Sequence, residues 1–210
     1  GDATEKKALP AGLVVMPESE YVASRFASAG VHAGMGGTER LLDVLLDTDA
    51  YGGQAGFRDG WPVARSREGH DVWPVHCYGM VGVGRNMSPD TGSGAELYTV
   101  IGHAPRHLDR NIALVGRAIS GIEHLSSLPR GTGALGFYED EAERVPIKSI
   151  RLISELPPED QLKFEYLSTR SNSFARYADA RQNRRDPFFI QPAGGADICN
   201  IPVPVRAIAK

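Results

Sequence analysis

The chain has 210 residues, of which 41% are hydrophobic and 23% are charged, and this composition excludes a disordered, collagen-like or coiled-coil protein. Its net charge of -3 and pI near 6.1 provide no basic field for a nucleic acid, so we expect no nucleic-acid partner. No run of about 18 apolar residues occurs, so the sequence predicts no membrane insertion.

The first part of the chain carries weak signals. With 24 glycines and 14 prolines, the composition favours a turn-rich β protein. The run Leu13–Met16 is a candidate strand, and residues 39–47 favour a helix or a loop packed on the core. The Gly-rich stretch 51–60 predicts a loop. The sequence starts at Gly1-Asp2, without methionine or a signal-like apolar run, which is the pattern of a mature or truncated product.

Clearer elements begin at residue 75. Apolar, β-branched and aromatic runs predict strands at 77–83, 96–101 and 112–115, with turn-forming loops between them. A short helix is predicted at 121–128, where apolar residues fall near helical spacing. The partial alternation at 145–153 predicts a further, half-buried strand.

The composition changes after Leu156. Two prolines follow, and residues 159–167 and 174–185 have helical patterns. The apolar tail at 188–205 contains Pro and Gly and predicts an irregular arm. We therefore place a boundary near Leu156, with an appendage behind it.

The most informative stretch runs from Met80 to Arg117. Its strings MVGVGR, SPDTGSGAELYTVI, HLDRN and LVGRA form the order strand, Gly/Ser loop, strand, polar loop, strand. This order resembles the proline-binding core of the cyclophilins, and Gly1-Asp2 resembles the end of the family's QGGD motif. The resemblance implies a mainly β fold, a cyclophilin-like closed antiparallel β-barrel that is incomplete at the N-terminus, with short helices and a helical C-terminal extension.

The same resemblance divides the chain. It implies a cyclophilin-like domain at 1–156 with an insertion in 3–74, and an extension at 157–210, helical and irregular, packed on the barrel. Residues 149–153 would supply the closing strand. Because the family's first strands precede its QGGD motif, the resemblance also implies either an N-terminal fragment that completes the barrel or a protein longer than this sequence.

The activity that the resemblance implies is peptidyl-prolyl cis-trans isomerisation of X-Pro bonds during protein folding, with proline-containing polypeptides as substrates. Rotation about a peptide bond breaks no covalent bond, so we expect no nucleophile, metal or cofactor. The family's catalytic Arg lies upstream of Gly1, and no catalytic residue is therefore assigned within this chain.

Six substrate-binding residues follow from the resemblance. Tyr98 would form the aromatic wall of the proline pocket and Leu108 an apolar contact in it. The other roles are backbone contacts to the residue before proline (Gly84, Arg85), a bond to the substrate backbone where the family usually has Gln (Glu96), and the pocket rim where it often has Trp (His107).

Two other functions stay open. Glu96, His107 and Ile112 stand where the family has Gln, Trp and His, which favours the alternative of a catalytically weak peptide-binding or chaperone module. The extension at 157–210 is also a candidate docking segment for a partner protein. Neighbouring His76 and Cys77 would point to opposite faces of a strand, so they are a poor pair for a metal, and we expect no metal site.

The two cysteines are Cys77 and Cys199. In a cytosolic protein they would be free thiols, and in an oxidising compartment they would form one bridge. The resemblance to exported bacterial cyclophilins with long insertions favours the bridge. It also implies a periplasmic or exported protein, with a cytoplasmic location as the alternative.

Overall fold

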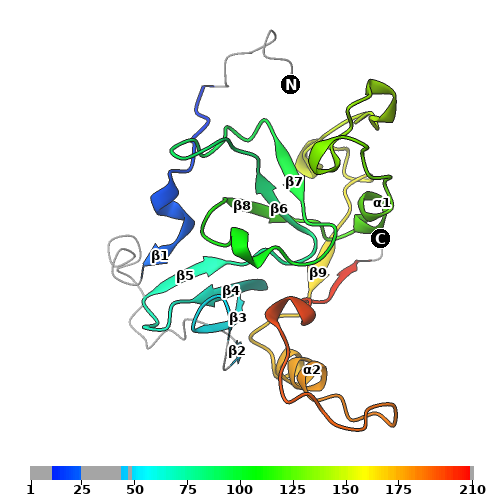
Figure 1. Ribbon diagram of the computed structural model, residues 1–210. Coiled ribbons are helices and arrows are strands. Elements are labelled where there is room, and N and C mark those ends of the chain that lie inside the picture. The colour runs from blue at the N-terminus through cyan, green and yellow to red at the C-terminus, as the bar shows by residue number, and fades with distance from the viewer. Residues whose placement is uncertain (1–10, 25–43, 47–48, 209–210) are drawn as a thin grey trace.

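The structure is a computed structural model that describes residues 11–24, 44–46 and 49–208. Short strands connected by long loops dominate it, with two α-helices and several 3-10 turns in the described ranges (Figure 1). The strands are β1 (Ala23–Ser24), β2 (Val44–Leu46), β3 (Gln54–Arg58), β4 (Trp61–Arg65), β5 (Asp71–Pro74), β6 (Met80–Val83), β7 (Leu97–Thr99), β8 (Leu114–Arg117), β9 (Phe164–Tyr166) and β10 (Val205–Ala207). The helices are α1 (Ile122–Ser126) and α2 (Asn172–Gln182), and the 3-10 turns are η2 (Glu18–Tyr21), η4 (Arg106–Leu108), η5 (Ala134–Gly136), η6 (Glu141–Glu143), η7 (Ile153–Glu155) and η8 (Ile198–Asn200).

The strands pair in three antiparallel sheets. One has the order β1-β5-β4-β3-β2, a second has the order β7-β6-β8, and β9 pairs with β10. Figure 1 shows the sheet of β6, β7 and β8 beside the five-stranded sheet. A mainly β fold with short helices is therefore confirmed. The described strands pair as three separate sheets, without a continuous ring, so barrel closure stays a prediction.

The strands predicted at 77–83, 96–101 and 112–115 correspond to β6, β7 and β8. The predicted helices at 121–128 and 174–185 correspond to α1 and α2. In α2 the Ser171 hydroxyl accepts the Phe174 N–H at 3.1 Å and caps the first turn.

The loop prediction for 51–60 is wrong for half of that range, which β3 occupies. Strands β3 and β4 are joined by the two residues Asp59 and Gly60, whose φ values are 48° and 80°. Positive φ at both positions is what a two-residue hairpin turn needs, since it matches the twist of the flanking strands. The hairpin places Phe57 in the core.

Four further predictions of secondary structure are wrong. The described part of 39–47 is strand β2, residues 13–16 form no strand, and β9 lies inside the predicted helix at 159–167. Pairing of β2 with β3 and of β9 with β10 overrides the local pattern there, and residues 13–16 have no strand partner in the described part of the chain. No strand forms at 145–153 either, and Ile147 and Ile150 there are 78% and 84% exposed.

The extension at 157–210 shares the core of the rest of the chain. Phe174 of α2 packs edge-on against Phe57 of β3, with ring centroids 4.9 Å apart. Ile198 and Ile201 of the tail join the same buried cluster, which also holds Trp73 of β5. The extension contains the β9–β10 pair as well as helix and irregular chain.

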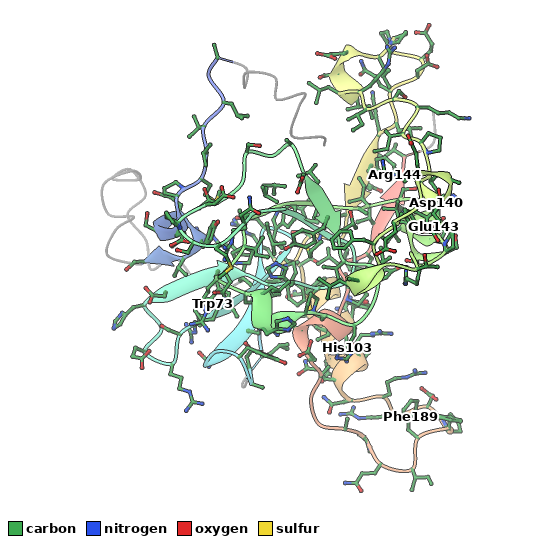
Figure 2. All side chains as sticks on the ribbon, turned by 45° about the horizontal axis from the view of Figure 1, so that its top comes forward. Trp73, His103, Asp140, Glu143, Arg144 and Phe189 are labelled. Carbon is green, nitrogen blue, oxygen red and sulfur yellow. A yellow bond between two sulfur atoms is a disulfide. The ribbon has the colours of Figure 1, made fainter. Side chains whose placement is uncertain are left out.

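A disulfide between Cys77 and Cys199 joins the tail to the segment before β6, the pairing that the sequence analysis favoured. Figure 2 shows Trp73 among the strands, whereas Phe189 lies on a loop that projects from the body beyond α2. In the part of the chain that the structure describes, no helix combines the length and apolar character needed to cross a bilayer.

Candidate functional site

Strands β6 and β7 position four of the six predicted binding residues. In their register Gly82 lies opposite Tyr98, and the Gly84 N–H donates to the Glu96 carbonyl at 2.8 Å. The Tyr98 ring lies directly over Gly82, where an added Cβ would be 2.3 Å from the ring carbon Cζ. Glycine at this position therefore makes room for the aromatic ring.

The loop from Arg85 to Glu96 is held by side chains within it. The Asp90 carboxylate accepts the backbone N–H groups of Asn86 at 2.9 Å and of Gly92 at 3.0 Å. These bonds lower the pKa of Asp90. The Arg85 side chain donates through Nε to the Asn111 carbonyl at 2.9 Å, which ties the loop to the turn before β8.

The other two predicted residues lie on η4. His107 is exposed and Leu108 is half-buried. The Asn111 amide donates to the carbonyls of His107 at 3.3 Å and Asp109 at 3.0 Å, which closes the turn. Beside β6, Tyr21 of η2 is buried in one small cluster with Val83 of that strand and with Ala113.

A buried histidine, His76, connects Tyr98 of β7 to the end of η4. His76 Nε2 lies 2.7 Å from the Tyr98 hydroxyl, and its Nδ1 lies 2.9 Å from Asp109 Oδ1. The His76 backbone N–H also donates to Asp109 Oδ1 at 2.9 Å. His76 has no exposed surface and Asp109 is 3% exposed. Through these hydrogen bonds, Tyr98 is linked to Asp109, the residue that follows Leu108.

The network continues to Arg106 and Asp49. Arg106 Nε donates to Asp109 Oδ2 at 2.7 Å, and its two Nη atoms donate to the Asp49 carboxylate at 3.0 and 2.8 Å. Burial alone would lower the pKa of Arg106, but the bonds to Asp49 and Asp109 outweigh it and raise the pKa. Asp197 of the tail approaches Arg106 at 3.7 Å. The buried charges are thus paired, as burial requires.

Tyr98 stays protonated in this setting. Burial raises the pKa of Tyr98 to about 12, with a further contribution from the negative charge of Asp109. Its ring is parallel to the His76 imidazole within 5°, with centroids 6.2 Å apart. The hydroxyl points to the buried His76, and Tyr98 as a whole residue is half-buried.

The sequence reasoning missed His76, Arg106, Asp109 and Asp49 as members of the site. The sequence analysis weighs His76 only as a metal ligand. The one local signal was the i,i+3 pair of Arg106 and Asp109. Among the described residues, no group of three or more His, Cys, Asp or Glu side chains is placed to hold a metal ion.

A cavity of about 390 Å³ lies elsewhere, where the tail meets β6 and α1. Its lining includes the disulfide, Met80, Ile201 and the two arginines Arg117 and Arg181. None of the six predicted binding residues lines it. The six predicted residues lie on or beside β6, β7 and η4, away from this cavity.

Among solved structures, the chain is similar to the cyclophilin AquaCyp293 from Hirschia baltica, with a TM-score of 0.55 and 20% sequence identity. The match covers 90% of this chain and 64% of that protein. The fold is cyclophilin-like. No family model matches the sequence, and no curated protein matches it. With 64% of AquaCyp293 covered, the chain spans less than two thirds of the length of that protein.

Proposed function

We propose that this chain supplies the peptide-binding surface of a peptidyl-prolyl cis-trans isomerase that acts on X-Pro bonds in protein chains. The observation that carries the proposal is the Tyr98 ring, fixed on β7 beside the pairing of Gly84 with Glu96, in a cyclophilin-like fold. The sequence resemblance implies that Tyr98 and Leu108 contact the proline ring of the substrate.

The chemistry needs only binding groups of this kind. Rotation about an X-Pro bond takes tens of seconds at 25 °C without a catalyst. An apolar seat for the ring and polar contacts to the flanking backbone accelerate it when they hold the twisted amide more tightly than the planar one. Each 1.36 kcal/mol or so of that difference gives a tenfold acceleration.

The remaining residues supply polar contacts around this seat. The exposed side chains of Glu96 and His107 lie on either side of Tyr98 along the chain and can bind the peptide backbone. The Gly84 N–H is bound to Glu96, so any contact of Gly84 with a peptide uses its carbonyl. The Arg85 guanidinium donates to the carbonyls of Asn86 and Asn111, and the resemblance gives the contact with substrate to the Arg85 backbone.

The family's catalytic Arg is expected on a polypeptide segment that joins this surface. Two observations support such a partner. Strands β7 and β8 form the edges of their sheet, and the segment 135–153 exposes large apolar side chains, with Leu135 98% and Phe137 69% exposed. Exposed edges and apolar patches of this kind are typical binding surfaces.

The disulfide supports our further proposal of an oxidising, periplasmic or exported location, rather than the cytoplasm.

The test combines binding and exchange measurements by NMR. A succinyl-Ala-Ala-Pro-Phe peptide should shift the backbone signals of β6, β7 and η4, and the protein should increase cis-trans exchange of the peptide. Tyr98→Ala should weaken peptide binding about tenfold or more, through loss of the ring's contact area. Tyr78→Ala is the matched control, because that exposed ring bonds Ser126 of α1, and it should leave binding unchanged.

The outcomes separate the two candidate functions. Binding with faster exchange supports the isomerase. Binding at this surface without faster exchange favours the non-catalytic peptide-binding or chaperone module, which Glu96, His107 and Ile112 support by their departure from the family pattern. A peptide that shifts no signals of β6, β7 or η4 would overturn both.

A further inference from the structure

We infer that His76 and Asp109 are positioning residues that hold the Tyr98 ring in a single orientation for peptide binding. The inference rests on the proposed function and deepens it, because it names the groups that organise the site from beneath. Neither His76 nor Asp109 has surface to offer a peptide, so both act through Tyr98.

The donors and acceptors that each group carries restrict the direction of each hydrogen bond. Asp109 accepts from the always-charged Arg106, so its carboxylate is ionised and can only accept. His76 Nδ1, at 2.9 Å from Asp109, therefore carries the proton. In a neutral imidazole this leaves Nε2 to accept from the Tyr98 hydroxyl, 2.7 Å away, whereas in an imidazolium Nε2 would donate to the hydroxyl oxygen. The Tyr98 hydroxyl is protonated, as its raised pKa requires, so it can take either part, and both arrangements join Tyr98 to His76.

Asp109 in turn is fixed from several sides. Its Oδ1 accepts both the backbone N–H and the ring N–H of His76, and its Oδ2 accepts Arg106 Nε. Arg106 is clamped by both oxygens of Asp49. The side chains of His76, Asp109, Arg106 and Asp49 are all 1–3% exposed. A network in which every described charge has a partner holds its members rigidly.

The Tyr98 ring is thereby fixed at two places. Gly82 lies beneath it so closely that a methyl group there would overlap the ring, and His76 binds its tip. The ring cannot swing toward the solvent without breaking the bond to His76. A preorganised aromatic surface binds a ligand more tightly because less side-chain freedom is lost on binding.

The first experiment observes the orientation itself by NMR. In the unchanged protein, long-range ¹H–¹⁵N spectra should show a proton on His76 Nδ1, and Tyr98 should populate one χ1 rotamer. His76→Leu should give rotamer averaging at Tyr98. His76→Gln should restore the single rotamer, because its amide oxygen reaches the acceptor position. An Nδ1 that carries no proton, or averaging of Tyr98 in the unchanged protein, would overturn the inference.

The second experiment is a double-mutant cycle in the Kd of the succinyl-Ala-Ala-Pro-Phe peptide. His76→Leu and Tyr98→Phe should each weaken binding about threefold to tenfold, the range of one hydrogen bond. In the Tyr98→Phe background, His76→Leu should add nothing. A merely structural effect of His76 would instead give the same factor in both backgrounds, which contradicts the inference.

The controls separate this inference from the proposed function. His124→Leu removes an exposed histidine, 84% exposed, and should leave both Kd and the Tyr98 rotamer unchanged. If His76→Leu fails to fold, His76→Gln and the spectra of the unchanged protein still decide. Absence of peptide binding with an ordered Tyr98 would defeat the proposed function alone, whereas peptide binding with no coupling between positions 76 and 98 would defeat the positioning role alone.

Discussion

Arg106 is the residue on which the charge balance of the buried network depends. It is 2% exposed and binds the carboxylates of Asp49 and Asp109, which are as deeply buried. Arg106→Met removes the compensating charge but keeps most of the volume. We predict a loss of about 3–5 kcal/mol in the free energy of unfolding, the cost of leaving buried charges unpaired. Urea unfolding followed by circular dichroism measures it.

A surface pair provides the control for this prediction. Arg170 and Asp59 lie 2.6 Å apart, but their side chains are 65% and 56% exposed. Solvent screening limits the value of such a pair to about 0–1 kcal/mol, so Arg170→Met should cost little. Similar losses for the two variants would show that Arg106 is not paired in the way described.

The contrast between Tyr98 and His76 shows which residues of the site a sequence can reveal. Tyr98 belongs to a contiguous motif whose order resembles a known family, so a role could be assigned to it. His76 and Asp109 are 33 residues apart, and Arg106 and Asp49 are 57 apart. Nothing in local spacing relates such pairs. Only tertiary packing brings η4 together with the segment between β5 and β6 and with the segment before β3, and that arrangement could not be predicted from the motif.

At the level of the strand, Gly82 of β6 makes a test of the hairpin geometry. An alanine Cβ there would be 2.3 Å from Cζ and Oη of Tyr98, well inside contact distance, so either the ring or the strand must move. Gly82→Ala should cost about 1–3 kcal/mol of stability, as overpacking usually does. It should also weaken the bond between Tyr98 and His76, visible as a change in the His76 ring signals.

The matched variant is Gly102→Ala. Gly102 is exposed after β7 and does not lie at positive φ, and a Cβ added there would meet no atom within 4 Å. Its substitution should change the free energy of unfolding by no more than about 0.5 kcal/mol. If Gly82→Ala were equally neutral, the Tyr98 ring could not lie where the structure places it.

The strands that were predicted have their partners close in sequence, but closeness alone did not make a strand predictable. Strands β6, β7 and β8 pair with one another and were predicted. The β3–β4 hairpin was missed although Asp59-Gly60 between two apolar runs is a strong hairpin signal. The strand β9 could not be predicted from its own residues, because its partner β10 lies about 40 residues further along.

For the whole molecule, the Cys77–Cys199 disulfide determines how firmly the tail is held to the sheets. It links residues 122 apart in sequence. Closing a loop of that length removes much of the freedom of the unfolded chain, worth about 5 kcal/mol in the chain-entropy model. The tail supplies Ile198 and Ile201 to the common core, so its release would expose core residues.

We therefore predict that the Cys77→Ser/Cys199→Ser variant loses roughly 3–5 kcal/mol in the free energy of unfolding. Urea unfolding of the oxidised protein and the variant gives this difference. The variant treated with reductant should unfold as it does without reductant, which separates loss of the bridge from any other effect of the reagent. Because the bridge acts mainly on the unfolded chain, the Tyr98–His76 bond should persist in the folded variant. A loss below about 1 kcal/mol would mean that the tail's apolar contacts alone hold it in place.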